Sequence, residues 1–499
     1  MVLITSLAIL LLTGRPSAAI APPIIAALLY GVWTQPLRYT VYPLVFIQCF
    51  FFEPPFWRGW LGGGTDPLSI LLMAGNALTN IFLNKVFGIS ALSLTGQELA
   101  YPLLFVLITI RAARGVRIDS AGRQPQANVM LAFLAIEIAT VGALEIWGAA
   151  TGGNMRSSLF QMRQLLWLPL QTFVLSYAMR DLRDFRTLAL TIICAALLKV
   201  SVGLYLTWQY VWSKNIEMAY MTGHSDSVLF VAVVFVFVAA WVHERSWRRL
   251  LTAVFLAGFV LFGIYVNSRR LAYVNLVGAF AAFYPLIGGP TKRRIKRGLL
   301  AAVPAILVYL ALARTHTTGI FAPGAQLVGI ANVADGSTQW RELENVNLIY
   351  TLRQQRILGS GWGHEFVEFI TLPTVADAYK EYRLVAHNSV LWLLGISGIV
   401  GFTLLWMPIV VGVYLAARSY RFAETPFERT AAASAVAVMV CYVSQAWGDI
   451  GIGASNPTLL LACALAMSAK LAIATGAWPS DTRLFAPSRF LPESEYGVK

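Results

Sequence analysis

AHNSVLWLL, residues 386–394, is the point at which a polar interval of the chain becomes an apolar one. The interval before it, residues 314–386, is the one long polar stretch in a sequence otherwise built of apolar runs. Apolar runs of about 20 residues cross a roughly 30 Å hydrocarbon layer as helices. We therefore expect the loop 314–386 to lie outside a membrane and residues 386–394 to mark the membrane edge.

The composition of the whole chain indicates the same class of protein. Of its 499 residues, 58% are hydrophobic and 12% are charged, whereas a soluble domain carries about 25% charged residues. The apolar runs predict an all-α polytopic membrane protein with about 12 to 15 transmembrane helices. Two or three spans are expected within residues 1–12, 18–33 and 37–52, and further spans at 68–87, 98–111, 127–147, 159–179, 188–210, 225–242, 249–266, 271–288, 298–313, 388–416, 430–447 and 456–474.

The net charge of +14 comes largely from lysines and arginines between the apolar runs. Such residues mark cytoplasmic loops, so nucleic acid is not expected as a partner. The resulting topology has a transmembrane bundle at 1–313, an extracytoplasmic loop with short helices at 314–386, a second part of the bundle at 387–474 and a cytoplasmic tail at 475–499. The other outer connections are 148–158, 211–224, 267–270 and 448–455.

Some common features are not expected. The four cysteines lie in apolar runs without the spacing of metal ligands, which argues against a disulfide framework and a zinc site. No metal and no cofactor are therefore predicted. The N-terminal apolar stretch has no basic segment before it, so a cleavable signal peptide is not expected either.

His387 is the first candidate for chemistry. An imidazole exchanges a proton near neutral pH, and the start of a helix beside it favours a neutral ring, so His387 is a candidate general base with Asn388 as a support. Arg269 and Arg270 occupy a short outer turn, where arginines need an anionic partner. The simpler interpretations are a histidine that caps the helix and arginines that reach lipid phosphates.

The loop itself carries three further features. Residues 340–353 have apolar side chains at helical spacing and predict an amphipathic helix near the membrane, with Arg341 in its first turn. Gly359 and Gly361 lack the spacing of a nucleotide-binding loop and predict a tight turn or a close backbone approach. Three weaker candidates for substrate binding or support are His364, Asp226 and His224.

Four of these elements, taken in order, resemble the bacterial O-antigen ligase and O-antigen polymerase superfamily. They are Ser268-Arg269 at the outer end of a span, Arg341 opening a loop helix, the Gly359-x-Gly361 turn, and His387-Asn388-x-x-Leu391 entering the next span, which continues to Gly398-Ile399-Val400-Gly401. The resemblance covers roughly residues 220–420.

The resemblance implies a C-type glycosyltransferase fold and a metal-independent, inverting reaction. A glycan on undecaprenyl diphosphate would pass to a sugar hydroxyl at the outer face of the bacterial inner membrane, in the periplasm. His387 would be the base, and Arg269, Arg341 and Arg270 would bind the diphosphate, because guanidinium groups match phosphate oxygens. The implied partners are this lipid-linked donor, a glycan or lipid A-core acceptor, membrane lipids, and other polysaccharide assembly and export proteins.

Several functions remain open from the sequence. Polymerisation of exopolysaccharide or O-antigen repeat units is preferred over O-antigen ligation and over protein O-glycosylation, which differ in the acceptor only. A transporter or flippase of polysaccharide precursors would instead place ionisable groups near the middle of the membrane, and Lys199, Glu137 and Glu145 are the candidates for this. A structural subunit of an export complex would leave His387 and Arg341 without a role.

Overall fold

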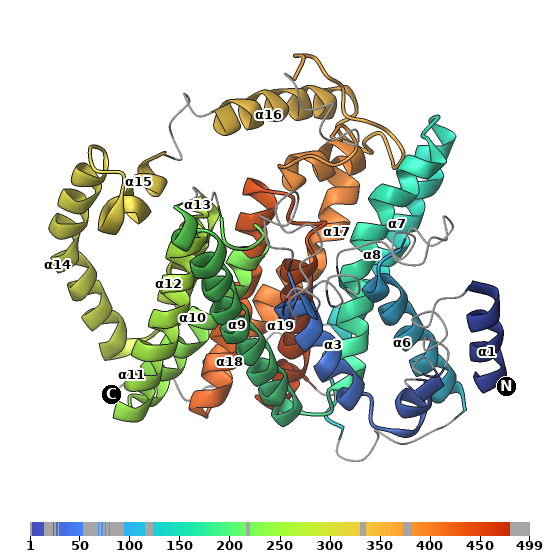
Figure 1. The fold of residues 1–499 in the computed structure, drawn as a ribbon, viewed down its shortest axis with the longest axis horizontal. Helices are drawn as coiled ribbons and strands as arrows, with labels where there is room; N and C mark the ends of the chain where they lie inside the picture. The colour runs from blue at the N-terminus through green and yellow to red at the C-terminus, as the bar shows by residue number, and fades with distance from the viewer. Residues whose placement is uncertain are drawn as a thin grey trace, which may run out of the picture. The chain divides into compact units, whose positions relative to one another are not determined.

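The structure is a computed structural model, and it describes residues 2–13, 23, 26–27, 29–52, 68, 71–72, 75, 79, 94–114, 123–215, 220–329, 336–372 and 382–479. All regular secondary structure in these ranges is helical (Figure 1). Eight of the helices are long and apolar enough to cross a membrane. The expected class is confirmed: the chain is an all-α, multi-pass membrane protein.

The chain divides into two compact units, which are described separately. The first unit, residues 1–123 and 170–223, holds α1 (Val2–Thr13), α3 (Arg38–Phe50), α6 (Gly96–Ala113), the end of α8 (Met155–Ala178), α9 (Leu182–Tyr210) and η2 (Trp212–Lys214). The second unit, residues 124–169 and 224–499, holds the start of α8 and the helices α7 (Asn128–Ala150), α10 (Asp226–Glu244), α11 (Trp247–Thr252), η3 (Ala253–Ala257), α12 (Gly258–Asn267), α13 (Arg270–Leu286), α14 (Gly289–Ala313), η4 (Gly319–Phe321), α15 (Ala322–Gly329), α16 (Gly336–Gln354), α17 (Ser389–Phe422), α18 (Pro426–Gly448) and α19 (Ser455–Ala474).

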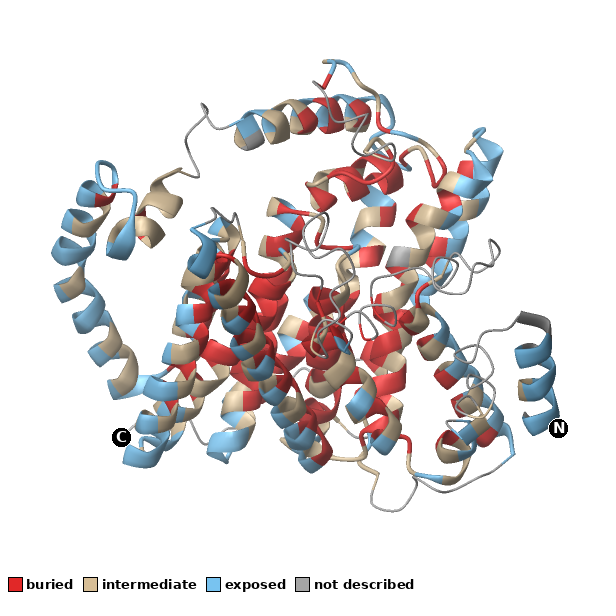
Figure 2. Ribbon diagram, viewed as in Figure 1, coloured by how far each residue is buried: buried red, intermediate tan, exposed pale blue. Residues whose placement is uncertain are grey.

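The core of the second unit is built around α18, which packs against α10, α13, α17 and α19. Alanine dominates the buried positions of α18 between 431 and 437, and α19 is also rich in alanine. Small residues let helix backbones approach closely in a membrane, where packing rather than water exclusion drives association. These two helices are the most deeply buried of the candidate spans, and Figure 2 shows the buried residues gathered there.

The helix boundaries agree with the expected spans to within about four residues except beside three basic clusters. The helix α9 begins at Leu182 rather than at 188, and α17 ends at Phe422 rather than at 416. The span expected at 298–313 begins at Gly289, with Pro290 in its first turn, a position at which proline favours a helix start. The run 292–297, expected as a loop, therefore forms the first turns of α14. Most of the expected span 68–87, half of 18–33 and the tail from 480 onward lie outside the described residues.

One span is broken and then joined through the outer loop. Within α17 the backbone of Gly398 is not helical, with φ 61° and ψ −176°. The groups released there bond to the loop after α16: the Ile396 carbonyl accepts from the Gly361 N–H at 2.9 Å, and the N–H of Ile399 donates to the Arg356 carbonyl at 2.9 Å. The loop therefore completes the hydrogen bonding of the span.

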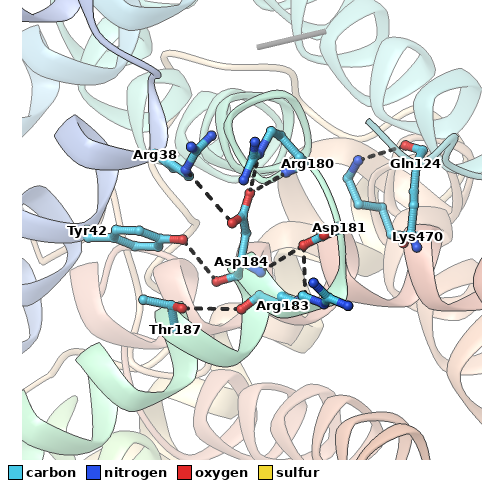
Figure 3. Close-up of polar contacts among 9 residues, drawn as sticks. All are labelled: Arg38, Tyr42, Gln124, Arg180, Asp181, Arg183, Asp184, Thr187 and Lys470. Carbon is cyan, nitrogen blue, oxygen red and sulfur yellow. Dashed lines mark hydrogen bonds and ion pairs between the residues drawn. The ribbon is translucent and has the colours of Figure 1, made fainter. Parts of the chain in front are cut away.

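In the first unit, a buried carboxylate holds α3 against the start of α9 (Figure 3). Asp184 lies 3.9 Å from Arg38 and 3.2 Å from Arg180, and its backbone carbonyl accepts from the Tyr42 hydroxyl at 3.2 Å. Asp181 caps α9 by accepting from the N–H groups of Arg183 and Asp184. A buried ion network thus fixes one end of this unit.

Ionisable side chains are also buried inside three spans, and two of them, Lys199 and Glu137, are charges that the sequence placed within apolar runs. Lys199 of α9 is fully buried in the first unit, and Glu137 of α7 and Lys470 of α19 are almost fully buried in the second. Lys470 donates to the Gln124 carbonyl at 3.1 Å. In a membrane protein, such groups are costly and often functional.

Candidate functional site

The helix predicted at 340–353 is present as α16, and the side chains that it buries against the protein are largely polar. Its buried residues include Glu344, Asn347 and Thr351, whereas the apolar Val346 and Tyr350 are exposed. The buried amide of Asn347 donates to the Ile370 carbonyl and accepts from the Ile370 N–H, both at 2.8 Å. Hydrogen bonds to the rest of the loop therefore decide how this helix is oriented.

His387 is held by α16 at the point where the loop enters α17. Its backbone N–H donates to both carboxylate oxygens of Glu344, at 3.1 and 3.2 Å, and its Nδ1 lies 3.4 Å from Oε1 of the same carboxylate. Glu344 is 1% exposed, whereas the His387 side chain is 30% exposed. Trp340 meets the imidazole edge to face at 4.8 Å. The ring is thus fixed on one side and open on the other.

The two residues after His387 attach the start of α17 to its neighbours. Asn388 caps the helix by accepting from the Leu391 N–H at 3.1 Å, and it donates to Asn345 of α16 at 3.1 Å. Ser389 donates to the Asp449 carbonyl at 3.4 Å and accepts from the Gly451 N–H at 3.2 Å. The start of α17 is therefore joined to the turn between α18 and α19.

Asp449 is the centre of this turn. Its carboxylate lies 3.1 Å from Nδ1 of His224. Burial opposes its ionisation, but the hydrogen bond and charge of His224, the Ile450 N–H and the charge of Arg341 together hold the pKa of Asp449 at about 2. Asp226 bonds to the first turn of α19, where its carboxylate accepts from the Asn456 amide at 2.6 Å. His224 and Asp226 thus tie the start of α10 to the turn after α18 and to the start of α19.

The arginine pair lies beside the same turn. Ser268 has a left-handed backbone, φ 52°, and reverses the chain from α12 to α13, so Arg269 and Arg270 stand at the start of α13. Arg269 is half-buried and Arg270 is exposed. A Cβ atom at Gly448 would lie 2.9 Å from the side chain of Leu271. The arginine turn is therefore adjacent to Gly448 and Asp449.

No protein-family model matches the chain, and no curated protein sequence matches it. The contacts above are therefore what any functional assignment rests on. They join four connections that the sequence placed on one membrane face: the turn before α10, the arginine turn, the loop 314–386 and the turn at 448–455. We define the candidate active site by six charged or imidazole-bearing residues of these connections: His224, Arg269, Arg341, Glu344, His387 and Asp449.

The glycine turn lies at a different place. Gly359, Gly361 and Gly363 all have positive φ, and Cβ atoms at these positions would meet backbone at 2.2 to 2.7 Å. Gly361 packs on Gly148 of α7, and Gly359 packs on Ile396. Ile396 lies in α17 nine residues after His387, about 13 Å away at the rise of a helix. The predicted close approach is confirmed, and its partners are α7 and α17 rather than the imidazole.

His364 also serves the packing of the loop on α7. Its Nε2 lies 3.0 Å from the Thr151 hydroxyl, and its carbonyl accepts from Gln161 at 3.0 Å. The fully buried Gln161 also donates to the Leu384 carbonyl and accepts from the Gly363 N–H. The contacts of His364 thus place it with the glycine turn and not beside His387.

Two residues of the site were not predicted from the sequence. The sequence predicted Glu344 as part of a helix but gave it no role in the site, although it lies three residues after Arg341 and therefore on the same helix face. Asp449 follows a long apolar run and was assigned to a connection without a role. A carboxylate directly after a span, next to glycines, is the sequence signal that would have identified it.

The arrangement combines a fixed, partly open imidazole with cationic side chains at the ends of membrane-spanning helices. A carboxylate on Nδ1 leaves Nε2 as the proton acceptor. Guanidinium groups nearby stabilise an anion as it forms. Among the described residues, no three His, Cys, Asp or Glu side chains gather as a metal site.

Proposed function

We propose that the protein transfers a glycan from undecaprenyl diphosphate to a hydroxyl group at the outer face of the bacterial inner membrane. One observation carries the proposal: the imidazole of His387 lies against Glu344, and Arg341 lies one turn earlier on the same helix. One face of α16 thereby carries both the cation and the carboxylate that holds the base. A glycan transfer needs the base and the cation: the base accepts the proton of the nucleophilic hydroxyl, and the cation stabilises the charge of the leaving group.

His387 acts as the general base. The Glu344 carboxylate accepts the Nδ1–H, which fixes the tautomer and leaves the Nε2 lone pair for the acceptor hydroxyl. The burial of Glu344 and the edge contact of Trp340 keep the ring in one orientation. A base positioned in this way accelerates a reaction by about 10² to 10⁴-fold. Glu344 is a positioning residue, because it acts through His387.

Arg341 and Arg269 stabilise the leaving group, with Arg270 at the exposed edge. As the acceptor oxygen attacks the anomeric carbon, the bond from that carbon to the diphosphate oxygen breaks, and the configuration inverts. The hydroxyl proton moves to Nε2 of His387, and the electron pair leaves with the undecaprenyl diphosphate. Planar guanidinium groups match the oxygens that gain this charge.

The acceptor defines the biological role. We favour a second lipid-linked repeat unit, which makes the protein a polymerase of exopolysaccharide or O-antigen. A lipid A-core acceptor would make it an O-antigen ligase, and a protein hydroxyl would make it an O-oligosaccharyltransferase. The same base and the same arginines serve all three acceptors.

The test is a lipid-glycan profile of a deletion strain that carries either the wild-type gene or a His387→Ala variant. The proposal expects long glycan chains with the wild type and single lipid-linked repeat units with the variant, at equal amounts of protein in the membrane. His316→Ala is the matched control, because His316 is an exposed histidine after α14. Normal chains from the His387→Ala strain would refute the proposal.

A transporter of polysaccharide precursors is the second candidate, and the buried charges favour it. Glu137 lies near the middle of α7 and lines a cavity of about 20 Å³ with Tyr442 and Thr458, room for about one water molecule. Ionisable groups at such depth are common in transport pathways. A transporter would keep its activity after the loss of His387 and lose it on Glu137→Leu.

A further inference from the structure

A second cavity lies at the opposite end of the same helices from His387. It is bounded by the last turns of α10, α13 and α17 and by the first turns of α14 and α18. Because α10 alone runs for 19 residues, about 28 Å, this cavity is separated from the candidate active site by roughly the thickness of a hydrocarbon layer. Its volume is about 720 Å³, within the range of about 300 to 1,000 Å³ for ligand sites.

The polar lining of this cavity is cationic. Arg245, Arg421 and Arg429 come from three different helix ends, and no carboxylate of the described residues lines the cavity. The nearby Glu244 is bonded to Arg249 at 2.6 Å, and Glu428 accepts from the backbone N–H groups that precede α18. Glu244 and Glu428 therefore have other partners, and the charged side chains described in the lining are arginines.

Hydrogen bonds hold two of these arginines at the cavity. The guanidinium of Arg245 donates to the Thr291 hydroxyl. The backbone of Arg245 is left-handed, with φ 51°, a conformation that costs a non-glycine residue about 1 kcal/mol or more. The Nε of Arg429 donates to the Ala423 carbonyl at 3.2 Å, which leaves its terminal amino groups for a ligand. Beside them, His243 is fixed between Tyr420 at 2.9 Å and Thr430 at 3.0 Å.

The remaining walls are apolar, from Val242, Leu286, Ile287 and Phe422. A cavity at a helix-bundle end whose lining combines three guanidinium groups with apolar side chains matches an amphiphile with a phosphate head group. Basic pockets between transmembrane helices bind anionic lipids in this way.

We propose that this cavity binds a phosphate-bearing anion, with the head group of an anionic phospholipid as its ligand. A free phosphate compound shares this chemistry and would bind the same arginines without using the apolar walls. The proposal is independent of the glycosyl-transfer reaction, because no residue of the candidate active site lines this cavity.

The test uses the full chain purified in an uncharged detergent and measures its melting temperature on titration with phosphatidylglycerol, phosphatidylcholine or inorganic pyrophosphate. The triple variant Arg245→Gln/Arg421→Gln/Arg429→Gln removes the cationic lining. The control Arg248→Gln/Arg293→Gln/Arg294→Gln removes the same charge from exposed arginines that do not line the cavity.

Phosphatidylglycerol is expected to raise the melting temperature of the wild type and of the control at similar concentrations. For the same rise in melting temperature, the cavity variant should need a phosphatidylglycerol concentration on the order of 100-fold higher, because each arginine strengthens binding by about a factor of five. Stabilisation by pyrophosphate that is lost in the cavity variant would identify a free phosphate compound as the source; stabilisation by phosphatidylglycerol alone identifies the lipid.

Equal responses of the cavity and control variants would overturn the proposal, and so would an equal response of the wild type to phosphatidylcholine. If the triple variant does not fold, Arg421→Gln alone is compared with Arg294→Gln. The phosphatidylglycerol concentration needed for stabilisation is then expected to be about fivefold higher for Arg421→Gln.

Discussion

Asp449 and His224 lie 225 positions apart in the sequence, and their side chains meet at 3.1 Å. This contact joins the start of α10 to the turn between α18 and α19. Because Ser389 bonds to the same turn, it also fixes the place at which His387 enters the membrane. The stability of the site therefore depends on the charge of Asp449.

The stability of the protein should fall in acid because of this carboxylate. The pKa of Asp449 is about 2 in the folded protein and 3.8 in the absence of its partners. A lowered pKa stabilises the folded state above pH 4, and this contribution, about 2 kcal/mol, is lost as the pH falls from about 4 to 2. Melting temperatures across that range should drop for the wild type and drop less for Asp449→Asn. Equal acid sensitivity of the two proteins would contradict this assignment.

Glu344→Gln should reduce glycan transfer on the order of 100-fold or more, because an amide does not hold the proton on Nδ1 of His387. The pH dependence of the rate should change as well, which a purely structural role would not cause. Glu342→Gln is the control, since Glu342 is exposed on the same helix. The rate of polymer formation from a purified lipid-linked donor is the measurement.

Arg341→Lys should lower the maximal rate on the order of 100-fold with a smaller effect on KM. A lysine keeps the charge but lacks the planar pair of donors that matches a diphosphate. Arg353→Lys, at the exposed end of the same helix, should behave as the wild type. A rate unchanged by Arg341→Lys would remove this residue from the leaving-group site.

Gly361→Ala should prevent stable folding, or lower the melting temperature by more than 10 °C. Its φ of 80° disfavours a side chain, and the added Cβ would lie 2.4 Å from the Gly148 nitrogen. Gly152→Ala separates these two effects, because Gly152 also has a positive φ, 91°, but has open space around it. We expect the Gly152 variant to lose about 1 kcal/mol only. Similar losses in both variants would show that crowding is unimportant.

Asp184→Asn should destabilise the first unit by about 3 kcal/mol, because it leaves two arginines beside a neutral amide. Asp181→Asn should change stability by a few tenths of a kcal/mol, since asparagine caps a helix as well as aspartate. Thermal unfolding in detergent compares the two. The prediction fails if both substitutions have the same effect.

The helices were predictable from the sequence because membrane-spanning runs satisfy their own backbone and need only length and apolarity. The basic clusters were the exception, at 292–297, at the start of α9 and at the end of α17. Their charge marked them as loops, but lysines and arginines are good helix formers, and Pro290 permits α14 to start before its basic run.

The partners of the site residues were not predictable in the same way. His387 and Glu344 are 43 residues apart, and no periodic pattern links them. The apolar spacing of α16 predicted the helix itself, but not that Asn347 and Thr351 would be buried, because the loop supplies the hydrogen bonds for them. Tertiary contacts of this kind are invisible in the local pattern.

The break at Gly398 has a mechanical consequence for the outer loop. Because Arg356, Ile357 and Gly361 complete the hydrogen bonds of α17, a protease cut in this stretch would expose unpaired peptide groups inside a span, at a cost of several kcal/mol each. The loop cannot hinge away as a lid while the span stays intact. In the proposed glycan transfer, donor and acceptor would therefore enter past a rigid rim, and turnover should persist when this stretch is stapled to α7 by an engineered crosslink.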